Sequence, residues 1–516
     1  MMKVVLLWLW LASVVALPKD GDLVESMPGF DDGWQSNFSM YSGYLDVDLT
    51  GSGLFYSSLR IHYELHTCVG GNASCPVAVW HQGGPGGSAL YGAWTEMGPF
   101  HLMAGGPVTN FAKAWNNVAN MLYLESPAGS TIAQGEKATG FSSCSSATGV
   151  MRWCSWNDVT QGIAYAYTLR AFYDKFPELR SNDLYLVGES YAGQYIPNIV
   201  HYMLANPGIV GKPVKGIAVG NACFGGTEST VLCNGRNAER NDIQMYYGKG
   251  LISKHLYDDI VKSCDKMRDL SPLGKIVGDA KCLAQIAKAK EAIGAYNIYN
   301  VYDNCNLNPT TIEKESATLS NLDFLRGDAM TTGTNFPTKA TVVKATTNEP
   351  TGGGGYPWEC ESDPDLDVYF MREDLLEALH LDFGSGSAFR YDRSGPASVL
   401  LYPHIIKNMR VLIYNGDADL CVPYLGNEQW TSSMVDLGVA VETEPWHPWY
   451  DQGDEGGNYA PAGYVTVYDV PDKNYTKTAG DDFAFLTIRL AGHMVPQYQP
   501  KAALAFFGRF LKGGTF

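Results

Sequence analysis

Short apolar runs alternate with a helical pattern through the first half of the chain. The runs at 77–80, 121–124 and 184–187 are apolar throughout and are followed by polar or Gly-rich turns. Residues 158–176 instead place apolar side chains at helical spacing, and residues 44–49 alternate apolar with acidic positions, as antiparallel strands do. Buried strands that alternate with helices predict an α/β fold, with a mostly parallel central sheet flanked by helices.

The pattern changes after residue 222. From 223 to 360 the chain is helical and polar, shows little strand character, and holds six of the eleven cysteines. Strand-like apolar runs resume at 411–414 and 485–488, and a helix is predicted near 500–511. These runs indicate that the sheet of the first half continues after an interruption.

We therefore predict one α/β core with a helical insertion, or cap, between core strands. The first part of the core is assigned to 17–222, the insertion to 223–360 and the second part of the core to 361–516. Within the insertion, the Thr- and Gly-rich stretch at 331–355 is interpreted as a loop and as a candidate site of proteolytic cleavage.

The N-terminus has the pattern of a secretion signal. Lys3 precedes an apolar run at 4–12, and the small or β-branched residues at 14–16 suit cleavage before Leu17. A membrane anchor would need about 18 or more apolar residues, and the acidic residues soon after the run argue against one. We predict a signal peptide at 1–16, no membrane anchor, and a location in the secretory pathway, either extracellular or in a vacuole or lysosome.

Cysteines and sequons fit an exported protein. Eleven cysteines predict disulfide bonds, and the odd number leaves one over. Sequence spacing does not determine the connectivity, but three pairs are close enough to bridge locally: Cys68 with Cys75, Cys144 with Cys154, and Cys223 with Cys233. Sequons predict glycosylation at Asn37, Asn72 and Asn474.

Composition and charge exclude several classes of function. The 31 Tyr and 12 Trp can build a large core, so the chain is not globally disordered. A net charge of −17 without any run of basic residues argues against nucleic acid as a partner. The chain has neither Cys-x-x-Cys nor His-Glu-x-x-His, so no metal site is predicted and no cofactor is implied.

The sequence Gly-Glu-Ser-Tyr-Ala-Gly at 188–193 stands between a predicted strand and a predicted helix. A nucleophile elbow places its serine at such a turn, where the hydroxyl is exposed above the sheet. The motif departs from Gly-x-Ser-x-Gly at Ala192, although a small residue is kept where strand and helix pack closely. Because a string of this kind arises by chance in roughly a third of chains of this length, Ser190 needs support from other residues.

An acid and a base follow the two late strands. Asp417 and Asp419 come after the strand at 411–414, and His493 comes after the strand at 485–488. Open α/β sheets build their sites at the carboxyl ends of strands, and the order Ser, Asp, His is that of α/β-hydrolases.

We therefore predict a catalytic triad of Ser190, Asp419 and His493. His493 would take the proton of the serine hydroxyl and later hand it to the leaving amine, while the aspartate holds the imidazole's tautomer. The spacing of the residues does not by itself decide between Asp417 and Asp419.

Backbone amides for an oxyanion are also available. A carbonyl oxygen that becomes an anion needs preorganised N–H donors. The Gly- and Pro-rich loop at 83–87 can bring backbone amides close to the serine, and the N–H of Tyr191 is the natural second donor.

In combination these motifs resemble the serine carboxypeptidase family. The resemblance rests on residues 188–193, on Gly-His-Met-Val-Pro at 492–496 and on the loop at 83–87, with supporting matches at 42–45, 96–99, 250–253 and 499–500. It implies an α/β-hydrolase fold with a helical insertion, and release of single amino acids from peptide or protein C-termini. It also implies that the catalytic acid is Asp419 and that Gly84 and Tyr191 supply the oxyanion amides.

The same resemblance implies a cluster that binds the substrate's free carboxylate. Mapped onto this chain, the cluster comprises Gln82, Gly83, Glu96 and Glu189. The two glutamates would share a proton, so that a carboxylic acid can donate a hydrogen bond to the substrate. We then expect activity to fall as the pH rises above about 6 to 7, when that proton leaves.

Three positions depart from the family pattern. Gln82 stands where many members have Asn, Gly87 where they have Cys, and Leu490 where Gly is frequent. The missing cysteine implies the loss of one family disulfide, whose usual partner corresponds to Cys360.

Other functions remain open on this sequence. A related acyltransferase would use the same triad to pass an acyl group to an alcohol, and a binding or protective protein would use none of it. A general esterase would be indifferent to the C-terminal carboxylate, which the retained Glu96 and Glu189 argue against. The pattern leaves a homodimer open as well.

Overall fold

The computed structural model describes residues 21–30, 32–71, 74–103, 106–132, 140–227, 231–294, 296–303, 364–382, 384–451, 460–476 and 480–516. Four features predicted from the sequence lie outside these residues: the signal peptide at 1–16, the sequon at Asn72, the loop at 331–355 and Cys360.

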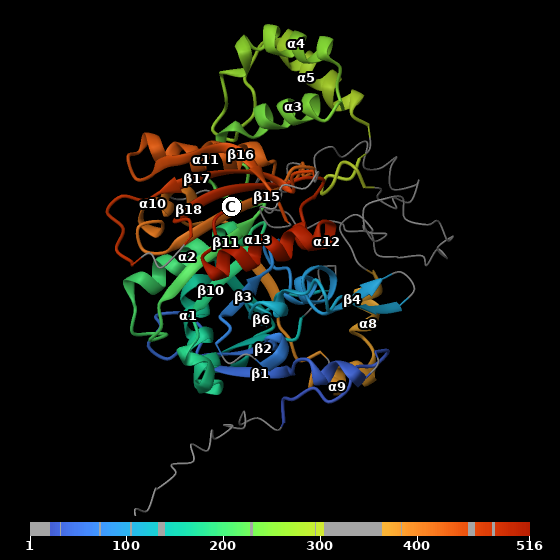
Figure 1. Ribbon diagram of the computed structural model, residues 1–516, viewed down its shortest axis with the longest axis vertical. Helices are drawn as coiled ribbons and strands as arrows, with labels where there is room; N and C mark the ends of the chain where they lie inside the picture. Colours follow the sequence, from blue (N-terminus) through green and yellow to red (C-terminus); the bar gives the residue numbers. More distant parts are fainter. Residues whose placement is uncertain are drawn as a thin grey trace, which may run out of the picture.

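A 12-stranded sheet forms the centre of the molecule (Figure 1). Its middle consists of parallel strands, which in spatial order are β6 (Asn120–Leu124), β3 (Val77–His81), β10 (Leu184–Glu189), β11 (Val214–Gly220), β15 (Arg410–Gly416) and β18 (Phe483–Ile488). The margins are antiparallel, with β1 (Met40–Asp48), β2 (Ser58–His66), β7 (Ser143–Ser146) and β8 (Gly149–Val150) at one end and β17 (Gly463–Asp469) and β16 (Val441–Trp449) at the other.

Smaller pairs of strands lie outside this sheet. They are β4 (Phe100–Met103) with β5 (Gly106–Thr109), β9 (Trp153–Asn157) with β14 (Ala388–Asp392), and β12 (Gly225–Gly226) with β13 (Val231–Leu232). Only the β9–β14 pair is parallel, and it ties the second part of the chain back to the first.

Helices cover both faces of the sheet because successive residues of a buried strand point to opposite sides. Val77 and Val79 pack in one core with α1 (Asp158–Lys175), α2 (Ala192–Ala205), α10 (Tyr402–Ile405) and α11 (Tyr424–Asp436). Ala78 and Trp80 pack in a second core with α8 (Pro364–Tyr369), α9 (Glu373–Ala378), α12 (Val495–Tyr498) and α13 (Pro500–Lys512). The predicted α/β class with helices on both faces is confirmed.

Helix α1 shows how local sequence sets an element's ends. The Asn157 side chain accepts the N–H of Thr160, whose hydroxyl in turn accepts the N–H of Asn157, so that a capping box begins the helix. Phe176, followed by Pro177, ends it, close to the predicted limits of 158–176.

The helices of the insertion form a cluster of their own at one end of the molecule (Figure 1). They are α3 (Ala238–Gly248), α4 (Lys254–Ser263) and α5 (Ala280–Ala292). Their buried side chains make a third core, and Asn237 and Asn241 of this region hydrogen-bond Gln429 of α11. The boundaries 223 and 360 of the predicted insertion stay a prediction, because the structure does not describe residues 304–363.

Disulfides join four pairs of cysteines among the described residues. The three local pairs suggested by spacing are present, and Cys264 is joined to Cys282 within the insertion. Asn37 and Asn474 are exposed, and their glycosylation stays a prediction. In the described part of the chain, no helix is both long and apolar enough to span a membrane.

The side chain of Trp115 packs between the C-terminal helix and the sheet. Substitution of Trp115 provides a test of this packing. Its ring stacks on Phe507 of α13 at 3.9 Å between centroids and meets Trp80 of β3 edge-on at 5.7 Å. All three are fully buried, so we expect Trp115→Ala to lower the free energy of unfolding by about 3–5 kcal/mol. Thermal unfolding followed by circular dichroism would show a lower Tm. Truncation of the exposed Val150 to alanine serves as the control, and equal Tm values for the two variants would contradict this packing role.

Candidate active site

The predicted site residues gather at one edge of the sheet. Ser190 follows β10, Asp419 follows β15 and His493 follows β18, while the loop at 83–87 follows β3. Because these strands run parallel within one sheet, their carboxyl ends lie at the same edge, where open α/β sheets place their ligands.

Ser190 stands on a sharp turn between β10 and α2. Its φ is 60°, a left-handed conformation that residues other than glycine rarely adopt, and its N–H donates to Gly220 O at 2.9 Å. This is the geometry of a nucleophile elbow, which directs a side chain away from both the strand and the helix.

Close packing explains the small residues around Ser190. A Cβ added at Gly188 would lie 2.4 Å from His81 O and 2.7 Å from Ala192 Cβ, and one at Gly193 would lie 2.3 Å from Cys223 O. Glycine is therefore required at 188 and 193, whereas alanine at 192 fits once residue 188 has no side chain.

Asp419 and His493 form a buried hydrogen-bonded pair. His493 Nδ1 lies 2.8 Å from Asp419 Oδ2, and the exposed fractions of the two residues are 3% and 0%. The second candidate, Asp417, instead accepts the N–H of Leu490 at 2.8 Å and lies 3.7 Å from Lys249 Nζ. The structure thus brings Asp419, and not Asp417, to the imidazole.

Three further donors hold the Asp419 carboxylate. Oδ1 accepts the N–H of Cys421 at 2.8 Å, and Oδ2 accepts the N–H of Val422 at 3.1 Å and the Nδ2 of Asn221 at 2.6 Å. The sequence reasoning missed Asn221, whose Oδ1 also accepts the N–H of Gly416 at 3.1 Å. The available signal was its position directly after strand β11.

Ser190 is partly exposed, and in this structure it is not hydrogen-bonded to His493. Catalytic hydrogen bonds of free enzymes are often long and tighten only when substrate is bound. Ser190 and His493 thus follow β10 and β18 at the same edge of the sheet, and the hydrogen bond between His493 and Asp419 is already formed.

The loop at 83–87 lies directly against the serine. A Cβ added at Gly83 would lie 2.5 Å from Ser190 Cβ and 2.8 Å from Tyr191 N, so only glycine allows this approach. Gly84 adopts φ 113°, which side chains rarely tolerate. Among the described residues the N–H groups of Gly84 and Tyr191 have no acceptor, which leaves both able to bind an oxyanion.

Gln82 joins the two predicted glutamates. Its Nε2 donates to Glu189 Oε1 at 2.7 Å and to Glu96 Oε1 at 3.2 Å, while its Oε1 accepts from Trp80 Nε1 at 2.8 Å and from Gly92 N at 3.1 Å. Every hydrogen-bonding position of this amide is therefore occupied within the protein.

Burial of the two glutamates favours a shared proton. Glu96 and Glu189 are 1% and 2% exposed, and burial raises the pKa of Glu96 to about 7. Burial, together with the neighbouring Glu96 carboxyl and then Asp419, raises the pKa of Glu189 well above its usual range. The Oε2 atom of each glutamate lacks a donor in the structure, and a proton held between the carboxyl groups would serve both.

Two departures from the family pattern are sterically linked. A Cβ at Gly87 would lie 3.1 Å from Gln82 Cγ and 3.1 Å from Gly83 O, tighter than nine in ten real Cβ contacts. A side chain at residue 87 would therefore require Gln82 or the loop to shift by a few tenths of an ångström. Leu490, the third departure, adopts φ 58°, a conformation that glycine adopts without strain.

The part of the chain that the structure describes offers one potential cluster of metal ligands, and it belongs to the dyad. Ligand atoms of Asp419, Cys421 and His493 lie within 4.8 Å of one another. Both Asp419 oxygens already accept N–H groups and His493 Nδ1 faces one of them, so hydrogen bonds account for this cluster.

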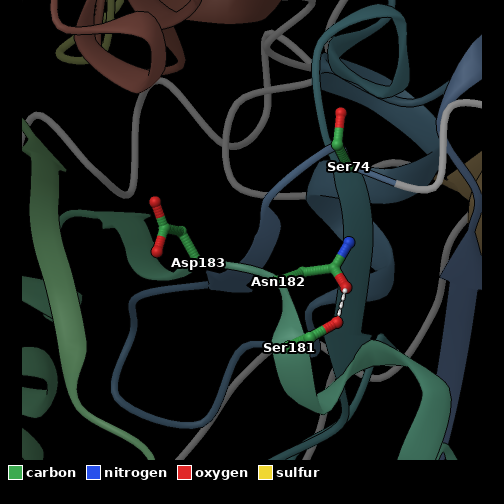
Figure 2. Close-up of a pocket in the computed structure, with 4 residues that line it drawn as sticks. All are labelled: Ser74, Ser181, Asn182 and Asp183. Carbon is green, nitrogen blue, oxygen red and sulfur yellow. Dashed lines mark hydrogen bonds between the residues drawn. The ribbon is translucent and has the colours of Figure 1, made fainter.

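A cleft lies at the opposite end of the sheet (Figure 2). It is lined by Ser74, Ser181, Asn182 and Asp183, which precede the first residues of β3 and β10. The Ser181 hydroxyl donates to Asn182 Oδ1 at 3.3 Å, a hydrogen bond that Figure 2 marks with a dashed line. This cleft contains none of the predicted site residues and is not the candidate active site.

Comparisons with known proteins agree with this geometry. Residues 28–513 match the family described as serine carboxypeptidase. Serine carboxypeptidase 1 of Hordeum vulgare is 29% identical over 96% of this chain and 93% of its own length, and the lysosomal protective protein of Mus musculus is 28% identical over 98% and 96%.

A solved structure shows the same fold. The crystal structure of KEX1(delta)p, a prohormone-processing carboxypeptidase from Saccharomyces cerevisiae, aligns with a TM-score of 0.59 at 16% identity, covering 95% of this chain and 94% of that chain. The α/β-hydrolase fold predicted from the sequence is confirmed. By the match over nearly its whole length, the chain belongs to the serine carboxypeptidase family of hydrolases.

Proposed function

We propose that this protein releases single amino acids from the C-termini of peptides through an acyl-serine intermediate, with a preference for acidic pH. The observation that carries the proposal is the buried pair of Glu96 and Glu189. Glu189 directly precedes Ser190, and the amide of Gln82 joins Glu189 to Glu96. A protonated carboxyl group beside the nucleophile can donate a hydrogen bond to the substrate's own C-terminal carboxylate. Internal peptide bonds and esters have no such carboxylate.

The geometry supports the following chemical steps. Ser190 Oγ attacks the last peptide carbonyl and its proton passes to His493, which Asp419 orients through Nδ1. The oxygen of the tetrahedral intermediate accepts the N–H groups of Gly84 and Tyr191. His493 then protonates the leaving amine, the carbon–nitrogen bond breaks, and an acyl-serine remains. Water, deprotonated by His493, attacks the ester and restores Ser190.

Gln82 takes a different part from the one expected from the family. Both N–H groups of its amide point to glutamate oxygens, so it positions the pair, and binding of the substrate carboxylate falls to Glu189 and the N–H of Gly83. Because Oε1 of each glutamate accepts from the amide of Gln82, the shared proton lies at the Oε2 atoms. From there Glu189 can donate it to the substrate carboxylate.

The other candidate functions are less well supported. An acyltransferase or a general esterase would use the same triad, but neither needs a proton-sharing carboxyl pair beside the serine. A protein that only binds or protects partners would need neither the elbow at Ser190 nor the His493–Asp419 hydrogen bond. The relative named lysosomal protective protein suggests a lysosomal or vacuolar location for this chain, within the secretory pathway.

The first prediction concerns the substrate's C-terminus. We expect the purified protein to release the last residue of an N-blocked dipeptide and to cleave the corresponding C-terminal amide far more slowly, because the amide cannot accept the proton of the glutamate pair as a carboxylate does. Amino-acid release at pH 5 is measured for both, with Ser190→Ala as the blank. Equal rates on acid and amide would favour an esterase-like site. Labelling of Ser190 by a fluorophosphonate without any release would favour the acyltransferase.

A second prediction concerns pH. Burial raises the pKa of Glu96 to about 7 and that of Glu189 well above its usual range, so the pair begins to lose its protons as the pH rises through about 7. We therefore expect kcat/KM to fall as the pH rises from 6 to 8. Glu96→Gln removes the titrating carboxyl group at residue 96. An amide then faces Glu189 in place of the carboxyl group that shares its proton. We expect kcat/KM at pH 5 to fall by about 10- to 100-fold, as for loss of a hydrogen bond to a charged group.

The matched control is Glu428→Gln on α11, since burial also raises the pKa of Glu428, which lies outside the site. Its pH profile should follow that of the unmodified protein. A profile of the unmodified protein that stays flat to pH 9 would contradict the shared proton.

A third prediction separates the two acids of the Gly-Asp-x-Asp motif. Asp419→Asn should lower kcat by about 10,000-fold, because an amide at this position favours the wrong imidazole tautomer. Asp417→Asn should leave kcat close to the unmodified value, since Asp417 contacts Leu490 N and Lys249 and not the imidazole. Steady-state kinetics on the N-blocked dipeptide check both, and a larger loss in Asp417→Asn would reverse the assignment.

A further inference from the structure

The last described segment of the insertion, residues 296–303, returns to the sheet between the two loops that carry Asp419 and His493. Three backbone hydrogen bonds join it to them. Leu420 N donates to Ile298 O at 2.9 Å and Val301 N donates to Ala418 O at 3.1 Å, on either side of Asp419. On the other loop, His493 N donates to Tyr299 O at 2.7 Å.

The contact with His493 is close on both backbone and side chain. The ring of Tyr299 meets the imidazole edge-on, with centroids 5.3 Å apart and planes at 61°. A Cβ added at Gly492 would lie 2.2 Å from Tyr299 O and 2.6 Å from Asn300 Cβ. The glycine before the histidine is therefore required for the segment to lie this near.

Asparagine side chains set the shape of the segment. Asn297, which is 2% exposed, accepts the N–H of Tyr299 at its Oδ1 at 2.9 Å, and Asn300 accepts the N–H of Tyr302 at 3.0 Å. Such side-chain bonds two residues along the chain hold a backbone turn without help from a helix or strand. The carbonyl groups of Ile298 and Tyr299 are thereby presented to the two loops.

The segment also connects the three cores of the molecule. Ile298 packs against both the insertion core and the core under α1 and α2, and Tyr299 packs against the cores on both faces of the sheet. Leu420, the residue after Asp419, is 2% exposed and belongs to the insertion core. The catalytic aspartate is thus bonded to the sheet on one side and anchored in the insertion on the other.

We propose that residues 297–301 position the catalytic dyad, and that Tyr299 is the positioning residue that sets the place of the His493 imidazole. The proposal rests on the function proposed above for His493. It makes the insertion part of the catalytic apparatus, because this segment is bonded to the loops of both Asp419 and His493. The two loops also bond one another directly, with Ala418 N donating to Ala491 O at 2.8 Å. A displacement of about 1 Å at a reacting group lowers the rate by about 100-fold, so loss of the contact should be visible in catalysis.

The test uses the rate at which a fluorophosphonate phosphonylates Ser190, since this reaction needs an activated serine but no recognition of a C-terminal carboxylate. Tyr299→Ala should slow labelling by about 10- to 100-fold. Tyr299→Phe keeps the ring and the backbone and should recover most of the rate. On the N-blocked dipeptide, Tyr299→Ala should lower kcat far more than it changes KM, because its contacts are with the loops of the dyad and not with the glutamate pair.

The matched control is Tyr257→Ala. Tyr257 is also a partly exposed tyrosine of the insertion, but it stacks on Tyr247 at 4.5 Å and not on the catalytic loops. Its labelling rate should equal that of the unmodified protein. Equal slowing in both tyrosine variants would show that general weakening of the insertion, and not the position of Tyr299, controls the serine, and would overturn the proposal.

Thermal unfolding of each variant guards against a failure to fold. If Tyr299→Ala does not fold, Asn297→Ala replaces it, since that change removes the side-chain amide whose oxygen accepts the N–H of Tyr299. Slower labelling in a folded variant supports the proposal, and labelling at the unmodified rate in either folded variant overturns it. Absence of labelling in the unmodified protein would instead show that Ser190 is not activated, which contradicts the proposed function itself.

Discussion

The carboxylate of Asp419 is fully buried, and the arrangement of the site depends on how that burial is compensated. A buried charge is strongly unfavourable unless hydrogen bonds replace its water. Here the N–H groups of Cys421 and Val422, the amide of Asn221 and the imidazole of His493 all point to it. Because these donors follow β11, β15 and β18, the carboxylate is satisfied only when the ends of three parallel strands are in register. The energy that keeps a charge in the core therefore also assembles the dyad.

Glu96 and Glu189 show the opposite solution a short distance away. They are as deeply buried as Asp419, but both depend on the amide of Gln82 as a hydrogen-bond donor. The Oε2 atom of each glutamate has no donor. Binding one proton then lowers the free energy of the pair, because it removes the repulsion between two buried negative charges. One edge of the sheet thus holds two kinds of carboxyl group. Asp419 is supplied with hydrogen-bond donors, which suits a charged partner for the imidazole. Glu96 and Glu189 are short of donors, which suits a protonated group that donates to a carboxylate.

The insertion is tied into this arrangement by backbone contacts rather than by a hinge. Ile298 and Tyr299 lend carbonyl groups to the loops on either side, and Leu420 places a side chain from the catalytic loop in the insertion core. Backbone bonds of this kind do not depend on the side chain that a residue carries, whereas the ring of Tyr299 adds a contact with the imidazole that does.

The sequence by itself determined the elements and the candidates for chemistry. Apolar runs and helical spacing depend on neighbours along the chain, so β3, β10, β15, β18, α1 and α13 were predicted close to their observed limits. The elbow at Ser190 was predictable for the same reason, since its strand, turn and small residues are contiguous.

Only the tertiary structure decided which side chains meet. The choice of Asp419 over Asp417, the part of Asn221 and the approach of Tyr299 to His493 all depend on strands β11, β15 and β18 lying side by side. Likewise, spacing along the chain does not reveal that Gly87 lies against the side chain of Gln82. Hydrogen bonds between loops 74 to 198 residues apart follow from strand order and register. These are set by the packing of whole faces of the sheet, which one stretch of sequence does not specify.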